Sequence, residues 1–198
     1  MLLVHVFDGK PYVVQTRGFK VTNRIHTDPV AAARAFGAVD ADEIICLDIT
    51  KDQTKESRSV FLDAFHRLSE EFFIPMTAGG GIRTLEDAAL LFALGADKIV
   101  VNTIIKSDPG LVQDLAHHFG NQAIVGSIDG GLQDERLSPL MQMVKAINFG
   151  CGEILFQAIP FDGSGAGYPL STIRTLSELP VPLIVLGGVG TWEHLYDG

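Results

Sequence analysis

The sequence is poor in cysteine, in positive charge and in long apolar runs, and each shortage excludes a class of protein. Two cysteines among 198 residues are too few for a disulfide framework, and both stand in apolar runs, which predicts buried free thiols. Lys and Arg number 15 against 24 Asp and Glu, and this net charge of −9 argues against nucleic acid as a partner. No apolar run reaches the roughly 20 residues of a membrane span, and the first ten residues lack a basic leader. We therefore expect a cytoplasmic protein without membrane contact.

Short apolar runs rich in β-branched residues alternate with helical patterns along the chain. The expected strands are 2–6, 43–49, 74–78, 98–102, 123–128, 153–158 and 182–186. The expected helices are 28–38, 57–72, 84–94, 108–119, 138–149, 169–178 and one starting near Thr191, and a hairpin or extended loop is expected over 8–25. Seven strand–helix alternations predict right-handed βαβ units and a parallel sheet.

Two parallel architectures fit this order, a doubly wound open sheet and a (β/α)₈ TIM barrel. Glycines follow two different strands, at 79–81 and at 187–188. Such loops suit a barrel, whose strand ends converge on one mouth, whereas a dinucleotide-binding sheet concentrates its glycines after the first strand. The glycine distribution therefore favours the barrel.

The chain also repeats itself. The residues around Pro75 recur around Pro182, and the pair Glu43-Ile44 recurs as Glu153-Ile154. This predicts a single TIM-barrel domain over 1–198 with a two-fold repeat, its half-barrels covering about 1–120 and 121–198. Because only seven βα units are visible, the eighth is expected to be missing from the chain as given.

The glycine-rich loops predict anion binding. Gly80 and Gly81 allow close backbone approach before a helix capped by Thr84, and Asn102 and Thr103 end a neighbouring strand. A second anion site is expected at a set of four residues, Asp162, Gly163, Gly187 and Gly188. Two such sites imply a substrate with two phosphates, or with one phosphate and another anionic end. The alternative is a pair of ordinary turns that need positive φ.

Acid–base candidates stand where strands end. Asp129 closes an apolar strand at the expected mouth of the barrel, where a carboxylate is rarely structural because burying it without a partner is costly. A catalytic or substrate-orienting role is therefore expected for it. Asp48 is expected in the same layer, binding a substrate hydroxyl or holding the polarity of the site. His5 faces the same mouth and can carry a proton near neutral pH. A site that has lost its original chemistry is the alternative.

Three charged residues begin alternate strands at the opposite end. Because alternate barrel strands contribute to one layer, Glu43, Lys98 and Glu153 are expected to meet there, at the least as a salt-bridged plug. The histidines show no metal-binding spacing, so neither a metal nor a cofactor is expected.

Several segments together resemble the cyclase subunit of imidazole glycerol phosphate synthase. They are 41–50, 74–82, 95–103, 152–155 and 162–168, in the same order and over nearly the whole chain. The resemblance implies a TIM barrel that forms a heterodimer with a glutaminase and uses its ammonia to cleave and cyclise a ribulosyl bisphosphate substrate. It also implies that Asp129 is one of two acid–base positions, that Glu43, Lys98 and Glu153 form an ammonia gate, and that Asp97 contacts the glutaminase.

Departures from this family pattern fall at the mouth. His5 stands at the position of the family's other acid–base aspartate, and Gln15, Gln157 and Leu186 stand at other polar family positions. Residues 17–20 and 54–58 look more like a paralogous branch of surface-polysaccharide biosynthesis. The resemblance therefore predicts an ammonia-using subunit that acts on a phosphorylated or nucleotide-linked sugar. The alternatives are the authentic histidine-pathway cyclase and a catalytically silent barrel that docks and activates a glutaminase.

Overall fold

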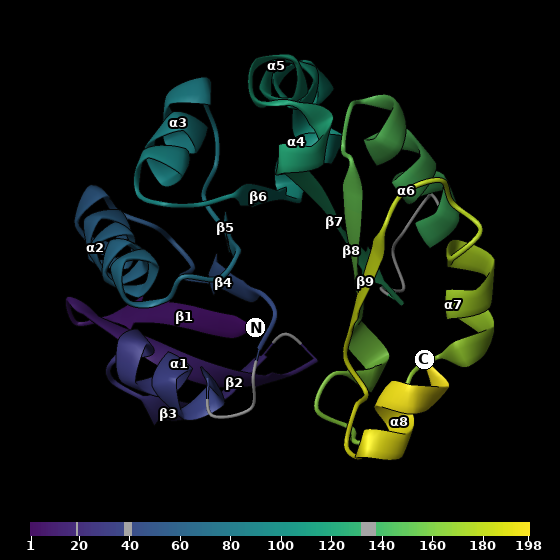
Figure 1. The fold of residues 1–198 in the computed structure, drawn as a ribbon, viewed down its shortest axis with the longest axis horizontal. Helices are drawn as coiled ribbons and strands as arrows, with labels where there is room; N and C mark the ends of the chain where they lie inside the picture. Colours follow the sequence, from purple (N-terminus) through teal and green to yellow (C-terminus); the bar gives the residue numbers. More distant parts are fainter. Residues whose placement is uncertain (19, 38–40, 132–137) are drawn as a thin grey trace. The chain divides into compact units, whose positions relative to one another are not determined.

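Strands and helices alternate along the chain in a computed structural model, which describes residues 1–18, 20–37, 41–131 and 138–198. The strands are β1 Leu2–Phe7, β2 Lys10–Arg17, β3 Lys20–His26, β4 Ile44–Asp48, β5 Met76–Gly79, β6 Lys98–Val101, β7 Ile124–Gly130, β8 Glu153–Ala158 and β9 Leu183–Leu186. The helices are α1 Pro29–Gly37, α2 Lys55–Glu71, α3 Leu85–Ala93, α4 Thr103–Ser107, α5 Pro109–Phe119, α6 Pro139–Asn148, α7 Leu170–Leu176 and α8 Trp192–Asp197 (Figure 1).

The chain divides into two compact units, residues 1–15 with 21–100 and residues 16–20 with 101–198. In the first, β1, β4, β5 and β6 are adjacent and parallel, and β2 adds antiparallel to β1. In the second, β7, β8 and β9 are adjacent and parallel. Parallel strands that alternate with helices confirm the α/β fold of TIM-barrel type. All seven predicted parallel strands are present in the described part of the chain, and the half-barrel boundary near residue 120 stays a prediction.

A hairpin fills the segment after the first strand, as predicted. Asp8 and Gly9 both have positive φ, +47° and +68°, and the residues on either side, Phe7 and Lys10, are paired. This is the two-residue turn that the right-handed twist of a hairpin favours, and Asp-Gly is its usual sequence.

The internal repeat is present at the level of backbone conformation. β5 is followed by Gly80 and Gly81, with φ of +97° and +69°, and β9 is followed by Gly187 and Gly188, with φ of +104° and +100°. Each glycine pair leads to a threonine that caps a helix, Thr84 with φ −144° and ψ 167° and Thr191 with φ −142° and ψ 164°. The same strand–glycine–cap unit is therefore built twice.

Each unit buries its own apolar layer between strands and helices. In the first unit, the buried face of α2 carries Phe61, Phe65 and Leu68, each 0% exposed, and α2 packs against β1 and α1. In the second, α6 packs against β7, and the fully buried side chains include Ile128, Met143 and Leu155. Burying side chains of this size contributes about 1.5–3 kcal/mol each.

Two local features differ from the sequence-based expectation. The short helix α4 precedes α5 directly, where only one helix was predicted, because Asp108 caps α5 and so separates the two. The single tryptophan, Trp192, is expected from the sequence to pack against the sheet, but it is 76% exposed. It lies on α8, a six-residue helix without a buried residue.

The two thiols provide a test of this packing. Cys46 and Cys151 are free and buried, and burial raises the pKa of each to about 12. We expect neither thiol of the native protein to react with a thiolate-specific disulfide reagent at pH 8, and both to react after denaturation, because the thiolate is the reactive form. Rapid labelling of either thiol in the native protein would contradict the packing around it.

Candidate functional site

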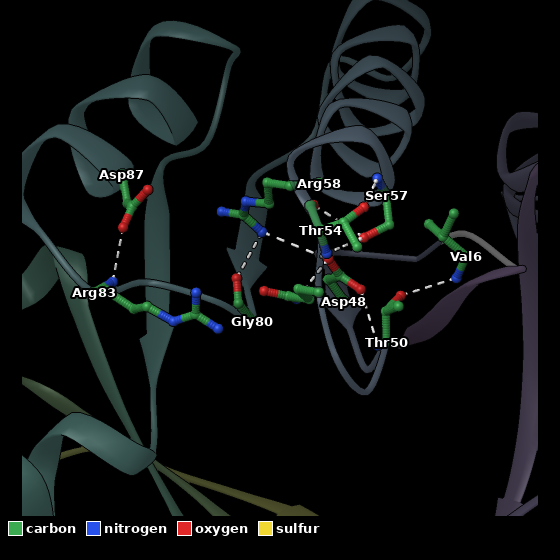
Figure 2. Close-up of polar contacts among 10 residues, drawn as sticks. Val6, Asp48, Thr50, Thr54, Ser57, Arg58, Gly80, Arg83 and Asp87 are labelled. Carbon is green, nitrogen blue, oxygen red and sulfur yellow. Dashed lines mark hydrogen bonds and ion pairs between the residues drawn. The ribbon is translucent and has the colours of Figure 1, made fainter. Parts of the chain in front are cut away.

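A buried carboxylate, that of Asp48, stands at the carboxyl end of β4. Its side chain has no exposed surface. Oδ1 accepts a hydrogen bond from the Thr50 amide at 3.0 Å, and Oδ2 accepts one from Nε2 of Gln53 at 2.8 Å (Figure 2). The Thr50 hydroxyl in turn accepts the amide of Val6 at 2.9 Å, which ties this loop to β1. Both carboxylate oxygens therefore accept hydrogen bonds from the protein itself, which supports the expectation that Asp48 holds the polarity of the site.

Arg58 joins this carboxylate to the glycine loop. Its Nη1 donates to the carbonyl of Gly80 at 2.6 Å and lies 3.7 Å from Oδ2 of Asp48. Dashed lines in Figure 2 mark both contacts. The guanidinium carbon also lies 5.4 Å from the ring centre of Phe61. Sequence reasoning missed Arg58 as a site residue. The signal was its place at helical spacing on the apolar stripe of α2, where an arginine needs a buried partner.

Burial dominates the electrostatics of this pair. It raises the pKa of Asp48, while the hydrogen bonds from Thr50 and the charges of Arg58 and His5 lower it by less. Burial also lowers the pKa of Arg58, and the charge of Asp48 raises it by less. The ordinary pKa of arginine is so high that the guanidinium stays charged. The ion pair is thus a positioning device that fixes the loop after β5 to the end of β4.

The glycine loop needs glycine for steric reasons as well as for its φ angles. A β-carbon on Gly80 would collide with the backbone carbonyl of Asp48, and one on Gly81 would collide with the carboxamide of Gln53. Within the described residues, the amides of Gly81 and Ile82 have no hydrogen-bond partner. Amides without a partner are what the predicted phosphate site requires, and phosphate binding at this loop stays a prediction.

The helix start beyond this loop is already capped by a carboxylate. Oδ2 of Asp87 accepts the amides of Arg83 at 2.9 Å and Thr84 at 3.1 Å, and the Thr84 hydroxyl accepts the amide of Asp87 at 3.1 Å. Asp87 and Thr84 thus form a capping box, in which Asp87 occupies the two amides that precede α3 and Thr84 occupies the amide of Asp87.

A second carboxylate, that of Asp129, ends β7 in the other unit. Its Oδ1 accepts a hydrogen bond from Nδ2 of Asn102 at 3.1 Å, and within the described chain Oδ2 has no partner. Burial raises its pKa, and the bond from Asn102 and the charge of Lys106 lower it by less. The structure thus brings together two predicted site residues, Asp129 and Asn102, and leaves one carboxylate oxygen open. Thr103 follows Asn102 and is exposed at the start of α4.

Gln157 lies beside Asp129 on the neighbouring strand β8 and on the same face, because the two residues are paired in register. Its Nε2 donates to the hydroxyl of buried Ser127 at 2.7 Å. The side-chain amide is therefore anchored within the sheet. Leu186 on β9 pairs with Gln157 and is half-buried.

The residues predicted for a second anion site have backbone roles. Oδ2 of Asp162 accepts the Thr16 hydroxyl at 3.0 Å, and Gly163 turns with a φ of +68°. A β-carbon on Gly187 would lie 2.8 Å from the carbonyl of Ala158, and one on Gly188 would collide with the carbonyl of Gly167. Close backbone packing thus accounts for these glycines, and anion binding by this set stays a prediction.

The amino ends of three strands hold a separate polar group. Glu43, which precedes β4, accepts a hydrogen bond from Thr77 of β5, and Lys98 of β6 lies 3.3 Å from its other oxygen. Asp97 is exposed and accepts the amide of Met76 at 2.8 Å. Glu153 is buried at the start of β8, in the other unit. The pairing of Glu43 with Lys98 is as predicted, whereas the gate role of the three charges and the partner contact of Asp97 stay predictions.

His5 is half-buried on β1, directly across from Tyr12 of β2. In the part of the chain that the structure describes, no group of three or more His, Cys, Asp or Glu residues is placed to hold a metal ion. None of the described helices is both long enough and apolar enough to span a membrane.

The network around Asp48 predicts the effect of removing its cation. We expect Arg58→Gln to lower the free energy of unfolding by about 2–4 kcal/mol, since it leaves a buried carboxylate short of its counter-charge. Asp48 already has a raised pKa, which penalises the folded state as pH rises through that pKa, and the variant raises it further. The loss of stability should therefore shrink on acidification. Urea unfolding at neutral and acidic pH measures it.

Arg34→Gln is the matched control, because Arg34 pairs with Glu71 at the surface, with 62% and 40% of the two side chains exposed. Exposed pairs contribute little to stability, because solvent screens the two charges. Equal destabilisation by the two variants would refute the positioning role of Arg58.

Comparison with known proteins shows the family of this chain. Residues 4–198 match the family described as histidine biosynthesis protein. The chain is 40% identical over 197 residues to the imidazole glycerol phosphate synthase subunit HisF of Exiguobacterium sibiricum, covering 92% of this chain and 78% of the relative. Proteins of the same name from Lachnoclostridium phytofermentans and Nostoc sp. are 38% and 36% identical, covering 86% and 85% of this chain and 71% of each relative. The chain therefore belongs to the histidine biosynthesis protein family.

Proposed function

We propose that this chain is an ammonia-dependent cyclase subunit of imidazole glycerol phosphate synthase type, paired with a glutaminase subunit. All three relatives above carry this enzyme's name, at 36–40% identity. They favour the histidine-pathway cyclase over a sugar of polysaccharide biosynthesis, which none of their names mentions. The order of the sequence-based hypotheses is therefore reversed.

The observation that carries the proposal is the half-buried carboxyl of Asp129. It stands at the carboxyl end of a parallel strand, the end at which enzymes of TIM-barrel type place their chemistry. Its raised pKa brings protonation closer to neutral pH, which suits a group that gives and takes protons. Asn102 holds one oxygen in place, and the other is open to a substrate.

Phosphate binding follows from the loop after β5. Gly81 and Ile82 offer two free amides, and the loop is fixed by the bond from Arg58 to Gly80. A loop that is rigid before the ligand arrives loses less entropy on binding. This supports a phosphorylated substrate held by the backbone donors of the glycine loop.

Ammonia entry is assigned to the opposite strand ends. Glu43, Thr77 and Lys98 form one connected polar group at the amino ends of three adjacent strands. Chemistry at the carboxyl ends has no use for these residues, whereas a passage for ammonia from a docked glutaminase does.

A second candidate function is a barrel that docks a glutaminase and has altered or lost its own chemistry. His5 stands where the resemblance expects an aspartate, and the amide of Gln157 is committed to Ser127. Turnover of the ribulosyl bisphosphate substrate with ammonium salt separates the two candidates. Activity supports the cyclase, whereas binding of a glutaminase without any turnover supports the second candidate.

The role of Asp129 predicts a variant with opposite effects on rate and stability. We expect Asp129→Asn to lower ammonia-dependent turnover about 10²–10⁴-fold, the range for losing an acid–base group. The raised pKa means that wild-type stability falls as pH rises through it, so the variant should equal the wild type in acid and be more stable at neutral pH. Thermal melts and initial rates measure both effects.

Asp114→Asn removes an exposed charge on α5 and serves as the control for Asp129→Asn. The control should leave the rate and the melting temperature nearly unchanged. Full turnover by Asp129→Asn would remove Asp129 from the chemistry.

The entry route predicts that Lys98→Met uncouples the two ammonia sources. We expect turnover with glutamine and the partner to fall several-fold more than turnover with ammonium salt, because the variant disturbs passage and leaves the mouth intact. Lys145→Met, on the exposed face of α6, is the control. Equal losses with both ammonia sources would leave the Glu43–Lys98 pair as a structural plug.

A further inference from the structure

A basic face lies on the hairpin side of β1. We define it by His5 and Phe7 of β1, Lys10 and Tyr12 of β2, and Arg24 of β3. The guanidinium carbon of Arg24 lies 4.2 Å from the ring centre of Phe7 and 4.7 Å from that of Tyr12. Within the described residues, Arg24 makes no hydrogen bond or ion pair. Its position is thus fixed by two rings, while its N–H donors are unused.

Strand register places the other members on the same face. His5 is paired with Tyr12, and Phe7 is paired with Lys10, so all four side chains project from one side of the β1–β2 pair. The opposite side carries Val4, which is 0% exposed. Phe7 is 43% exposed, Arg24 and Lys10 are exposed, and the face is therefore open to a solute.

The net charge of this region is opposite in sign to that of the whole chain. Residues 1–26 contain four Lys and Arg and one acidic residue, Asp8, whereas the whole chain has 15 against 24. None of the strands β1, β2 and β3 contains Asp or Glu. In an acidic protein, a local excess of cations marks the place where an anion is attracted.

We propose that the basic face is a binding subsite for a phosphate group, with Arg24 as its main donor. The planar guanidinium presents N–H groups that match phosphate oxygens, and cation–π contact with two rings fixes it before the ligand arrives. Lys10 and His5 stand beside it on the same face. The face lies at the carboxyl half of β1, where this fold binds small molecules, which favours a phosphorylated small molecule over an acidic protein. The proposal does not depend on the proposed reaction.

The test follows the side-chain Nε–Hε signal of Arg24 by NMR in the full chain, assigned by its loss in Arg24→Gln. Inorganic phosphate is titrated against chloride at matched ionic strength. We expect a saturable shift with phosphate alone, and phosphate binding about tenfold weaker in Arg24→Gln, as for a lost charged hydrogen bond. Lys20→Gln, which removes the same charge from the first residue of β3, should change the Kd less than twofold.

The rings supply the second readout. The double variant Phe7→Leu with Tyr12→Leu keeps every cation, and we expect it to weaken phosphate binding about two- to fivefold, whereas Tyr12→Phe keeps the ring and the affinity. The proposal is overturned if Arg24 shows no saturable shift, including the case in which only the amides of Gly81 and Ile82 respond. Equal weakening by Lys20→Gln and Arg24→Gln would also overturn it, since the effect would then be general attraction.

Discussion

The burial of the Asp48 carboxylate away from water determines how the polar contacts of the first unit are arranged. A carboxylate without exposed surface needs donors on both oxygens, and the chain supplies them from the loop that follows it, through Thr50 and Gln53. The same charge attracts Arg58, which stands on the apolar stripe of α2, as its counter-ion. Once there, Arg58 also binds the carbonyl of Gly80, so one buried charge fixes the end of β4, the start of α2 and the loop after β5.

Asp129 also stands near the carboxyl end of a parallel strand, but its carboxyl is hydrogen-bonded differently from that of Asp48. Burial raises the pKa of both carboxyls, but among the described residues Asp129 has one side-chain donor, Asn102, on one of its oxygens. A fully bonded carboxylate is a structural anchor, because moving a proton onto it would break the bonds that hold it. A partly bonded one can exchange a proton at little structural cost. The difference in hydrogen bonding separates the two roles, and the sequence motif, a strand that ends in Asp, does not.

The elements formed by local sequence patterns could be predicted from the sequence, whereas contacts between residues far apart in the chain could not. Seven parallel strands, the hairpin and the glycine turns follow from local patterns, and the Thr84 and Thr191 caps appear where their spacing places them. Pairing Glu43 with Lys98 required only the rule that alternate barrel strands share a layer. Arg58 and Arg24 were missed because their partners are far along the chain or are aromatic rings. The hydrogen bonds from the amides of Arg83 and Thr84 to Asp87, just before α3, also depend on side-chain geometry.

Net charge then explains why the placement of each cation matters. A chain of charge −9 repels an anionic substrate, and screening limits attraction to about 8–10 Å at physiological salt, so attraction must come from cations near the ligand. Arg58 is committed to Asp48, and Arg34 and Arg67 are paired with Glu71 and Asp28. Their charges are largely cancelled where they stand. Arg24 is held by neutral rings instead, and this keeps its position fixed without cancelling its charge. Aromatic support is thus the means by which an acidic protein keeps a cation both ordered and available to an anion.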